Sequence, residues 1–316
     1  MDIVHLIKSG TKLLFDKDYR FRILAAKGKY NDMPDEAYLK RLYKATFGKE
    51  LDLENPQTFN EKLQWLKLYY HRPDYTMMAD KVAVRPYIAQ KIGEEHLVPL
   101  LGVWDDPDDI DFDALPDQFV LKCNHNSGLG MCICKDKSKL DIEKVRSELR
   151  KGLAEDYSAV SREWQYKDIP RRIMCEKYMK DDKQTETTGI INYKVSCFNG
   201  VPKYIYVSSN VEGKKNDRLS LLTPEWENAP FTHGRYLPFD DIPEKPVNYE
   251  KMLEYSKILS EGIPYVRVDF YEIDSQLFFS ELTFTIASGF TRYQPETSDE
   301  LIGSWLTLPE KWNTEV

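Results

Sequence analysis

Residues 265–284 have the sequence YVRVDFYEIDSQLFFSELTF, and this stretch decides the fold of the chain. Polar and apolar side chains alternate in both of its halves, which predicts two strands. If the central Asp-Ser-Gln forms the turn, Asp269 lies opposite Glu281 and Arg267 lies opposite Thr283 on one face of a β-hairpin. Two opposed carboxylates destabilise a sheet unless a positive charge lies between them. We therefore predict a Mg²⁺ site of the kind that carboxylates form together with nucleotide phosphates.

Two other interpretations of this hairpin remain open. Its polar face could be solvated, as one face of an antiparallel hairpin commonly is. Alternatively, Arg267 could neutralise both carboxylates and form a structural triad without a metal ion. Tyr271 and Phe279 are expected on the same face as the charges, which favours a partly enclosed site.

The composition is that of an ordinary globular protein. The 316 residues are 41% hydrophobic and include six tryptophans, enough for a core that we expect to be divided between two subdomains. The net charge of −8 argues against a general nucleic-acid-binding protein, which needs clustered Lys and Arg. Five cysteines without a CxxC pair indicate neither a disulfide framework nor a zinc site, so a reducing cytoplasm fits best. No signal peptide or membrane-spanning segment is expected.

Residues 1–30 are more basic than the rest of the chain and also carry aliphatic side chains. Such an amphipathic segment can lie on an anionic membrane, which would place the protein at the inner face of the membrane. A helix that packs on its own domain is the commoner outcome. We expect a helical N-terminal region over residues 1–75, followed by a mixed domain over residues 76–316.

Helices and strands alternate along the mixed domain. Thr58 and Glu61 form a capping box at the start of one predicted helix. Asn199 and Gly200 supply the positive φ angles of a type I′ turn between two predicted strands. Helices are predicted within residues 35–70 and over 78–92, 140–153 and 249–261, and strands over residues 97–104, 119–123, 131–134, 173–179, 193–198 and 201–207.

A polar, glycine-containing loop follows the predicted strand that carries Lys122. Its sequence, NHNSGLG over residues 124–130, lets backbone N–H groups approach phosphate oxygens, while the lysine supplies a point charge. The glycine spacing is neither that of a Walker loop nor that of a dinucleotide fingerprint. Lys194 adds a second strand lysine. Considered singly, each lysine is more simply a solvated side chain.

The order of these parts resembles the ATP-grasp superfamily, in which two mixed α/β subdomains clamp ATP between their sheets. More closely, the chain resembles the TupA-like ATP-grasp family, named for teichuronopeptide biosynthesis, over about residues 55–311. The resemblance implies an α+β fold with an entry subdomain (76–118), an ATP lid (119–179) and a C-terminal metal and substrate subdomain (180–316). The motifs that carry it are FNEKLQW (59–65), DK (80–81), FVLKCNH (119–125), YK (193–194) and ELTFT (281–285).

The resemblance also implies roles for particular residues. Asp269 and Glu281 would hold Mg²⁺, and Arg267 would stabilise charge on an acyl phosphate. Thr283 stands where ATP-grasp ligases generally have asparagine, and its hydroxyl can still bind Mg²⁺. His125 would hydrogen-bond the nucleotide or fix the loop. The adenine would be contacted by Glu176 and by the backbone of Lys177 and Tyr178. The phosphates would be contacted by Lys81, Lys122, Lys194, Ser127, Gly128 and Gly130.

Residues 285–291 resemble the substrate loop that follows the metal strand in D-alanine ligases. Gly289 could present a backbone N–H to the substrate. Arg292 could bind a substrate carboxylate, or it could be an exposed loop cation.

The activity implied by the resemblance is that of an ATP-dependent carboxylate–amine ligase, an enzyme that forms an amide through an acyl phosphate. The surface-polysaccharide or capsule setting of the family suggests a uronic acid of a glycan as the acid and an amino acid or peptide as the amine. Nothing in the residues identifies either partner. Two other functions were weighed: a glycosyltransferase with Asp111-Phe112-Asp113 as its metal motif, and a catalytically silent nucleotide-binding protein.

Overall fold

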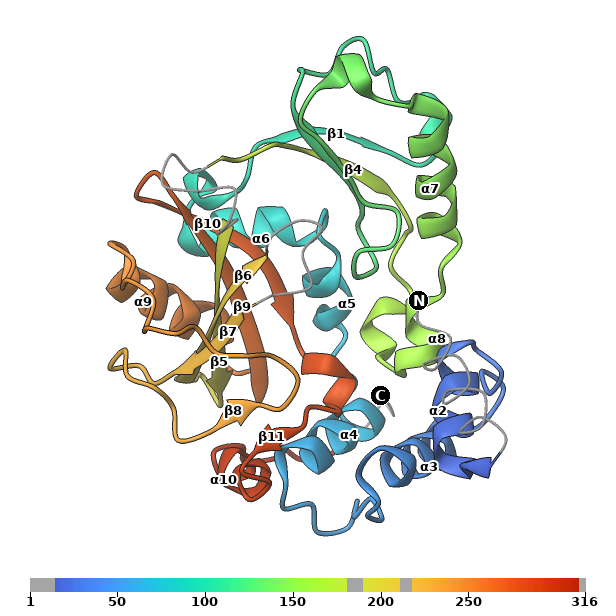
Figure 1. The fold of residues 1–316 in the computed structure, drawn as a ribbon, viewed down its shortest axis with the longest axis vertical. Helices are drawn as coiled ribbons and strands as arrows, with labels where there is room; N and C mark the ends of the chain where they lie inside the picture. Colours follow the sequence, from blue (N-terminus) through green and yellow to red (C-terminus); the bar gives the residue numbers. More distant parts are fainter. Residues whose placement is uncertain (1–14, 181–189, 211–217, 313–316) are drawn as a thin grey trace.

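The computed structural model describes residues 15–180, 190–210 and 218–312. In Figure 1 a smaller sheet lies at the top, a larger sheet at the lower left, and the N-terminal helices at the lower right. Neighbouring strands are antiparallel throughout both sheets, so the described fold is α+β, as predicted. The smaller sheet contains, in spatial order, β1 (Leu100–Trp104), β4 (Ile173–Lys177), β2 (Phe119–Cys123) and β3 (Cys132–Cys134).

The larger sheet has five strands and a small two-stranded sheet beside it. The two-stranded sheet pairs β11 (Tyr293–Gln294) with β8 (Thr232–His233). The type I′ turn predicted between β5 and β6 is present, because Asn199 and Gly200 both have positive φ. The larger sheet contains, in spatial order, β10 (Gln276–Thr283), β9 (Tyr265–Ile273), β5 (Ile190–Phe198), β6 (Val201–Asn210) and β7 (Arg218–Leu222).

The helices surround these sheets. In the described ranges, no helix is both long and apolar enough to cross a membrane. The α-helices are α2 (Lys17–Ala26), α3 (Asp35–Phe47), α4 (Phe59–Tyr69), α5 (Asp74–Ala79), α6 (Val84–Ile92), α7 (Ile142–Ala154), α8 (Tyr157–Ser161), α9 (Tyr249–Ser260) and α10 (Ser298–Ser304). The 3₁₀ turns are η1 (Glu94–His96), η2 (Pro107–Asp109), η3 (Lys137–Lys139), η4 (Trp164–Tyr166) and η5 (Ile286–Gly289).

The helix predicted over residues 78–92 is two helices, α5 and α6. Asp80 has an extended backbone, and its side chain accepts the N–H of Val82 at 2.8 Å. This hydrogen bond stabilises a turn, so the helix does not continue through Asp80. Lys81 consequently lies in the turn between the two helices. The predicted capping box of α4 is present, with Thr58 and Glu61 bonded reciprocally.

The β9–β10 hairpin has a two-residue turn, Asp274 and Ser275, both with positive φ, where a three-residue turn was expected. A β-bulge between Phe279 and Glu281 then adds the missing residue and restores the predicted register. Asp269 therefore lies opposite Glu281, and Arg267 opposite Thr283, as predicted.

The bulge also corrects one expectation. Phe279 pairs with Phe270, with ring centroids 6.4 Å apart, and is 4% exposed. It belongs to the core face of the sheet and not to the polar face, because the extra residue reverses the alternation between Phe279 and Glu281.

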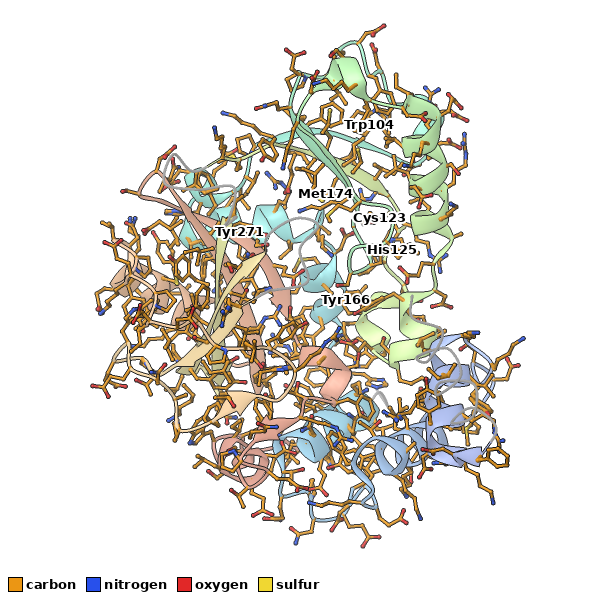
Figure 2. All side chains as sticks on the ribbon, in the orientation of Figure 1. Trp104, Cys123, His125, Tyr166, Met174 and Tyr271 are labelled. Atoms are coloured by element: carbon orange, nitrogen blue, oxygen red, sulfur yellow. The ribbon has the colours of Figure 1, made fainter. Side chains whose placement is uncertain are left out.

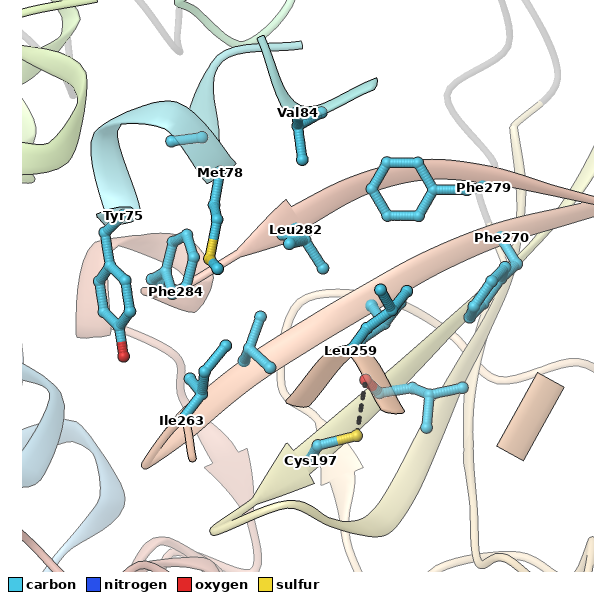
Figure 3. Close-up of a cluster of buried hydrophobic side chains, with 14 of the residues drawn as sticks. Tyr75, Met78, Val84, Cys197, Leu259, Ile263, Phe270, Phe279, Leu282 and Phe284 are labelled. Atoms are coloured by element: carbon cyan, nitrogen blue, oxygen red, sulfur yellow. Dashed lines mark hydrogen bonds between the residues drawn. The ribbon is translucent and has the colours of Figure 1, made fainter. Parts of the chain in front are cut away.

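The two faces of the larger sheet bury different groups. Val268 and Phe270 of β9 pack with Leu259 of α9 and Met78 of α5 in one apolar cluster (Figure 3). The opposite face begins at Tyr265, which packs with Phe59 of α4, and then becomes polar along the same strand. This change from apolar to polar side chains positions the site described below.

The N-terminal helices share the core of the larger sheet. Tyr38 and Leu39 of α3 belong to the same apolar cluster as Val268. Phe21 and Ala25 bury one side of α2, and Phe21 stacks on Tyr30 at 4.5 Å. Residues 17–26 therefore form a helix packed on its own domain, the commoner of the two outcomes considered. Residues 1–14, the rest of the segment considered for membrane contact, lie outside the described ranges.

Candidate active site

The predicted carboxylate pair is bridged by Arg267. The guanidinium donates to both oxygens of Asp269, Nε to Oδ1 and Nη2 to Oδ2, each at 2.6 Å. The same Nη2 donates to Glu281 Oε1 at 3.2 Å, and Lys194 Nζ donates to Asp269 Oδ2 at 3.0 Å. The arginine thus lies between the two acids, as in the second interpretation of the hairpin.

Thr283 completes this group on the same face. Its hydroxyl accepts from Arg267 Nη2 at 3.1 Å and donates to Glu281 Oε1 at 3.2 Å. Asp269 is almost fully buried, whereas the Glu281 side chain keeps 34% of its exposure. One oxygen-rich side of the pair, formed by Glu281 and Thr283, therefore remains accessible.

Positive charge surrounds Glu281. Burial would raise the pKa of this carboxyl, but four cations outweigh burial and lower its pKa to about 2. Burial would also oppose the charge of Arg267 and lower its pKa. The nearby carboxylates, Asp269 with the larger effect and Glu281 with the smaller, outweigh burial and raise the pKa of Arg267. The four cations are, from the largest effect to the smallest, Lys81, Arg267, Lys194 and Lys122.

Two of these four cations, Lys81 and Lys122, come from outside the larger sheet. Lys122 of β2 forms an ion pair with Glu176 of β4 at 2.6 Å, and Arg85 of α6 contacts the other oxygen of Glu176 at 3.4 Å. Burial acts to lower the pKa of Lys122, but Glu176 raises it overall, with smaller contributions from Tyr271 and Glu281. The polar faces of the two sheets therefore form one electrostatic neighbourhood. Figure 2 labels Met174 on the smaller sheet and Tyr271 on the larger sheet.

The loop after β2 has a buried stem. Asn124 donates to Asp80 Oδ1 at 2.8 Å and accepts the N–H of Arg172 at 2.7 Å. The Asn126 side chain donates to two backbone carbonyl oxygens, and the backbone carbonyl oxygen of Asn126 accepts from Lys81 Nζ at 2.8 Å. The stem thus holds Lys81 in place, although burial lowers the pKa of this lysine.

His125 also belongs to the stem. It is 2% exposed, and its Nε2 lies 3.2 Å from the carbonyl oxygen of Glu155. Burial lowers its pKa. Of the two roles considered for His125, this contact supports fixing of the loop.

The tip of the loop differs from its stem. Ser127, Gly128 and Leu129 are exposed, and a Cβ atom on Gly128 would meet nothing within 4 Å. Gly130 instead packs on Gly152 of α7, where a Cβ atom would lie 2.9 Å from the Gly152 Cα. Gly130 therefore anchors the loop to α7, while the tip is open to a ligand.

The predicted adenine contacts lie at the end of β4. The N–H of Lys177 donates to the carbonyl oxygen of Pro99 at 2.9 Å, so this donor is already used within the protein. The Glu176 carboxylate is held by Lys122 and Arg85. Tyr178 follows the strand, and residues 181–189 lie outside the described ranges.

A polar stripe on α4 holds the loop that follows β10. Asn60 pairs with the backbone of Thr291 through two hydrogen bonds, at 2.8 and 2.9 Å. Gln64 donates to the carbonyl oxygens of Ser288 and Gly289 at 3.1 and 2.7 Å. Gly289 is buried with φ of +74°, and a Cβ atom would lie 2.3 Å from Gln64 Nε2. Close packing against α4 therefore requires glycine at position 289.

Lys67 and Glu163 form a second charged cluster that the sequence reasoning missed. Lys67 Nζ donates to the carbonyl oxygens of Ser161 and Ser288 at 3.0 and 2.9 Å, and Glu163 accepts from the Ser288 hydroxyl at 2.8 Å. Burial lowers the pKa of Lys67 and raises that of Glu163. The spacing of Asn60, Gln64 and Lys67 was the available signal, because i, i+4 and i+7 share one helix face.

Arg292 lies elsewhere. Its guanidinium donates to the carbonyl oxygen of Thr46 and lies 5.8 Å from the ring centre of Phe47. Together with Glu296 and Asp299 it lines a cavity of about 580 Å³ beside α3, α4 and α10. These contacts do not join Arg292 to the Asp269–Glu281 group, so the substrate role considered for it remains a prediction.

Comparison with known proteins identifies the family of this chain. The sequence model of the TupA-like ATP-grasp family matches residues 61–307. The chain belongs to this family. ATP-grasp enzymes are carboxylate–amine ligases that use ATP and Mg²⁺, the two cofactors predicted from the sequence. No curated protein matches the chain significantly.

The chain is also similar to several solved structures at low identity. The D-alanine–D-alanine ligase from Bacillus anthracis complexed with ATP is 16% identical, with a TM-score of 0.38 over 66% of this chain and 54% of that chain. N5-carboxyaminoimidazole synthetase from Staphylococcus aureus is 12% identical, with a TM-score of 0.38 over 66% and 44%. The ATP-grasp ligase PsnB, complexed with a phosphomimetic variant of minimal precursor, Mg and ADP, is 10% identical, with a TM-score of 0.40 over 82% and 65%. The chain spans about half the length of the first two.

Proposed function

We propose that this TupA-like ATP-grasp chain is an ATP-dependent carboxylate–amine ligase. The observation that carries the proposal is the convergence of Lys81, Lys122, Lys194 and Arg267 on Glu281, next to the buried Asp269. Four cations beside a carboxylate pair match the charge of a triphosphate with its metal ion.

The donor set fits Mg²⁺. Glu281 and Thr283 offer accessible oxygens, and Asp269 lies directly opposite Glu281. No group of three or more His, Cys, Asp or Glu side chains in the described ranges is arranged to hold a metal ion. Two carboxylates completed by phosphate oxygens are a common arrangement for Mg²⁺. When bound, the ion would neutralise charge on the phosphates, and Arg267 would be free to contact the transferred group.

The proposed reaction has two steps. A substrate carboxylate oxygen attacks the γ-phosphorus of ATP, and ADP leaves. The amine, which has first released the proton of its ammonium form, then attacks the acyl carbon. Phosphate leaves, and the amine nitrogen passes a second proton to the departing phosphate as the amide forms. Lys122 and Lys81 would hold the phosphates under the Ser127–Leu129 tip, and Arg267 with Lys194 would stabilise charge on the acyl phosphate. The exposed tip would exclude water from this intermediate when it closes over ATP.

The substrates are part of the proposal. We infer an acid of the uronic type, carried by a surface glycan, and an amino acid or peptide as the amine, because these suit the polysaccharide setting that the family name suggests. Basic residues near the N-terminus would suit work at the inner face of a membrane, where lipid-linked glycans are built.

Hydroxylamine trapping tests the proposed function. The purified full chain is incubated with ATP, Mg²⁺, hydroxylamine and either D-glucuronic acid or a galacturonic acid oligosaccharide. We expect a hydroxamate, formed with an equal amount of ADP, because hydroxylamine captures an activated carboxyl group. ADP release without hydroxamate for both acids, or no ATP turnover at all, would count against carboxyl activation of uronic acids.

The glycosyltransferase alternative gains no support from its candidate motif. The Asp111 carboxylate accepts the N–H groups of Asp113 and Ala114 at 3.0 and 3.3 Å, and Phe112 is buried. The motif is therefore a side-chain-capped turn.

A further inference from the structure

A cavity of about 630 Å³ lies between the N-terminal helices and the loop after the metal strand. Its walls come from α2 and α3, from the segment around α8, and from η5. This volume is typical of pockets that bind small molecules. The α2 and α3 walls precede residue 61, so they lie outside the part of the chain that the family model matches.

The charges in this cavity are divided between two walls. Arg22 of α2 and Lys27, the residue that follows α2, line one side. Glu155 and Asp156, which precede α8, line the other. Asp156 is used by the protein, because its Oδ1 accepts from Ser158 and Ala159 at 2.8 and 3.1 Å. The Glu155 Oε2 atom is buried and has no hydrogen-bond partner among the described residues. A buried carboxylate oxygen without a donor is costly, and a ligand ammonium in the cavity that Glu155 lines would offset the charge of this carboxylate.

Hydrogen bonds between the surrounding segments hold the walls of this cavity in place. Arg162 donates to the carbonyl oxygens of Tyr30, Asn31 and Met33 at 2.8, 3.0 and 3.1 Å. Tyr38 donates to the carbonyl oxygen of Val160 at 3.0 Å. These bonds tie the N-terminal helices to the α8 segment, so the two charged walls are held apart at a fixed separation. Such preorganisation reduces the entropy cost of binding.

The acidic wall is the one nearer the carboxylate pair. Tyr157 lines the cavity, and burial raises its pKa, with further contributions from Glu163, Glu281 and Glu155. Tyr157 therefore lies within electrostatic reach of both Glu155 and Glu281. Ser288 of η5 lines the same cavity and is held with φ of +53° by the Lys67–Glu163 cluster. A ligand amine at Glu155 would point toward the reaction centre, and a ligand carboxylate at Arg22 and Lys27 would point away.

We propose that this cavity binds the amine substrate, and that this substrate is a zwitterion: an α-amino acid or a short peptide with its ammonium at Glu155 and its carboxylate at Arg22 and Lys27. The inference rests on the proposed ligase function. The N-terminal helices would then select the amine. The basic residues at α2 would bind the carboxylate of the ligand, which is a role other than membrane contact.

Calorimetric titration of the full chain with defined ligands tests the assignment. The ligands are L-alanine, L-glutamate and L-alanyl-L-alanine, each in the presence of Mg²⁺ and a non-hydrolysable ATP analogue, with N-acetyl-L-alanine and ethylamine as matched ligands that lack one charge. We expect at least one zwitterion to bind, and each single-charge ligand to bind at least tenfold more weakly. Glu155→Gln and the double variant Arg22→Ala/Lys27→Ala should each weaken zwitterion binding about tenfold. Lys29→Ala, a change on an exposed lysine near the end of α2 that does not line the cavity, is the control.

Failure of this inference is distinguishable from failure of the ligase proposal. Hydroxylamine is small and does not need the charged walls, so hydroxamate formation by the wild type tests carboxyl activation independently of the cavity, and the control variant Lys29→Ala should form hydroxamate at the same rate. If hydroxamate forms but none of the zwitterions binds, or if the variants bind them as tightly as the wild type, the cavity is not the amine site. If the wild type forms no hydroxamate, the ligase proposal itself fails.

Discussion

Two charged clusters of this chain, one around Glu281 and one at Lys67 and Glu163, differ in whether neighbouring charges or burial dominate their pKa values. Around Glu281, four cations outweigh burial and lower the pKa of the carboxyl to about 2, so both signs of charge persist. At Lys67 and Glu163, burial dominates and moves both pKa values toward the neutral forms. The first cluster keeps partial exposure at Glu281, whereas Lys67 and Glu163 are 4% and 2% exposed.

The difference separates a cluster suited to ligands from one suited to structure. An excess of cations beside an accessible oxygen leaves charge for a phosphate to use. The buried pair has no such excess. Lys67 donates to the backbone of Ser161 and Ser288, and Glu163 accepts from the Ser288 hydroxyl. We therefore expect substitutions in the sealed cluster to change stability and substitutions in the open cluster to change activity.

The largest expected effect is on the sealed cluster. Lys67→Met removes the donor to the carbonyl oxygens of Ser161 and Ser288, which should reduce the free energy of unfolding by about 2–6 kcal/mol because two buried acceptors lose their partner. Urea unfolding followed by circular dichroism measures it. Lys67→Met/Glu163→Gln should recover part of the loss. Lys40→Met, which breaks the exposed Lys40–Glu36 pair, is the control and should change little. Equal losses for Lys67→Met and Lys40→Met would contradict the comparison.

The open cluster should respond in activity. Asp269→Asn removes one charge of the pair that Arg267 bridges, and we expect ATP turnover to fall about 100-fold or more, the size of effect typical for one electrostatic group in an active site. Coupled ADP release measures it. Asp113→Asn, at an exposed loop carboxylate, should keep wild-type turnover and also tests the glycosyltransferase motif. Retained turnover in Asp269→Asn would remove the metal assignment.

The loop after β2 offers the same contrast between buried and exposed positions. Gly130→Ala combines a positive φ with a Cβ contact of 2.9 Å to Gly152, and should cost about 2–4 kcal/mol of stability. Gly128→Ala also has a positive φ but open space, and should cost about 1 kcal/mol. Thermal unfolding of the two variants compares them directly. A larger loss for Gly128→Ala would show that the anchor is misplaced.

The smallest effect concerns pH. Because folding lowers the pKa of Glu281 from its usual 4.5 to about 2, the unfolded chain binds the proton first as pH falls. The stability that Glu281 contributes is complete above about pH 4.5 and is lost as pH falls toward 2. Wild type should therefore exceed Glu281→Gln in stability at pH 6, with a gap that narrows by pH 3. Glu254→Gln, on the exposed side of α9, should show no such narrowing. A gap that stays constant with pH would mean that Glu281 does not titrate as described.

Local patterns in the sequence were enough for the hairpin and its charged pairs. Alternation placed Arg267 and Asp269 on one face of β9, and the opposed positions of Glu281 and Thr283 followed from the hairpin. The two-residue turn and the bulge were not foreseen, and they cancelled each other in the register while moving Phe279 into the core. A bulge has no sequence signature as strong as alternation, so only the Phe279 placement was lost.

The amino-acid sequence by itself determined the family and the α+β architecture, and it proposed candidate residues for Mg²⁺ and phosphates, because periodicity and short motifs are local properties of a chain. The tertiary structure alone decided which distant residues meet. It brought Lys81 and Lys122 to Glu281, sealed Lys67 against Glu163, and set Arg22 across a cavity from Glu155. Such meetings depend on how α2, α4 and the two sheets pack, and burial and charge act only on groups that packing has brought together.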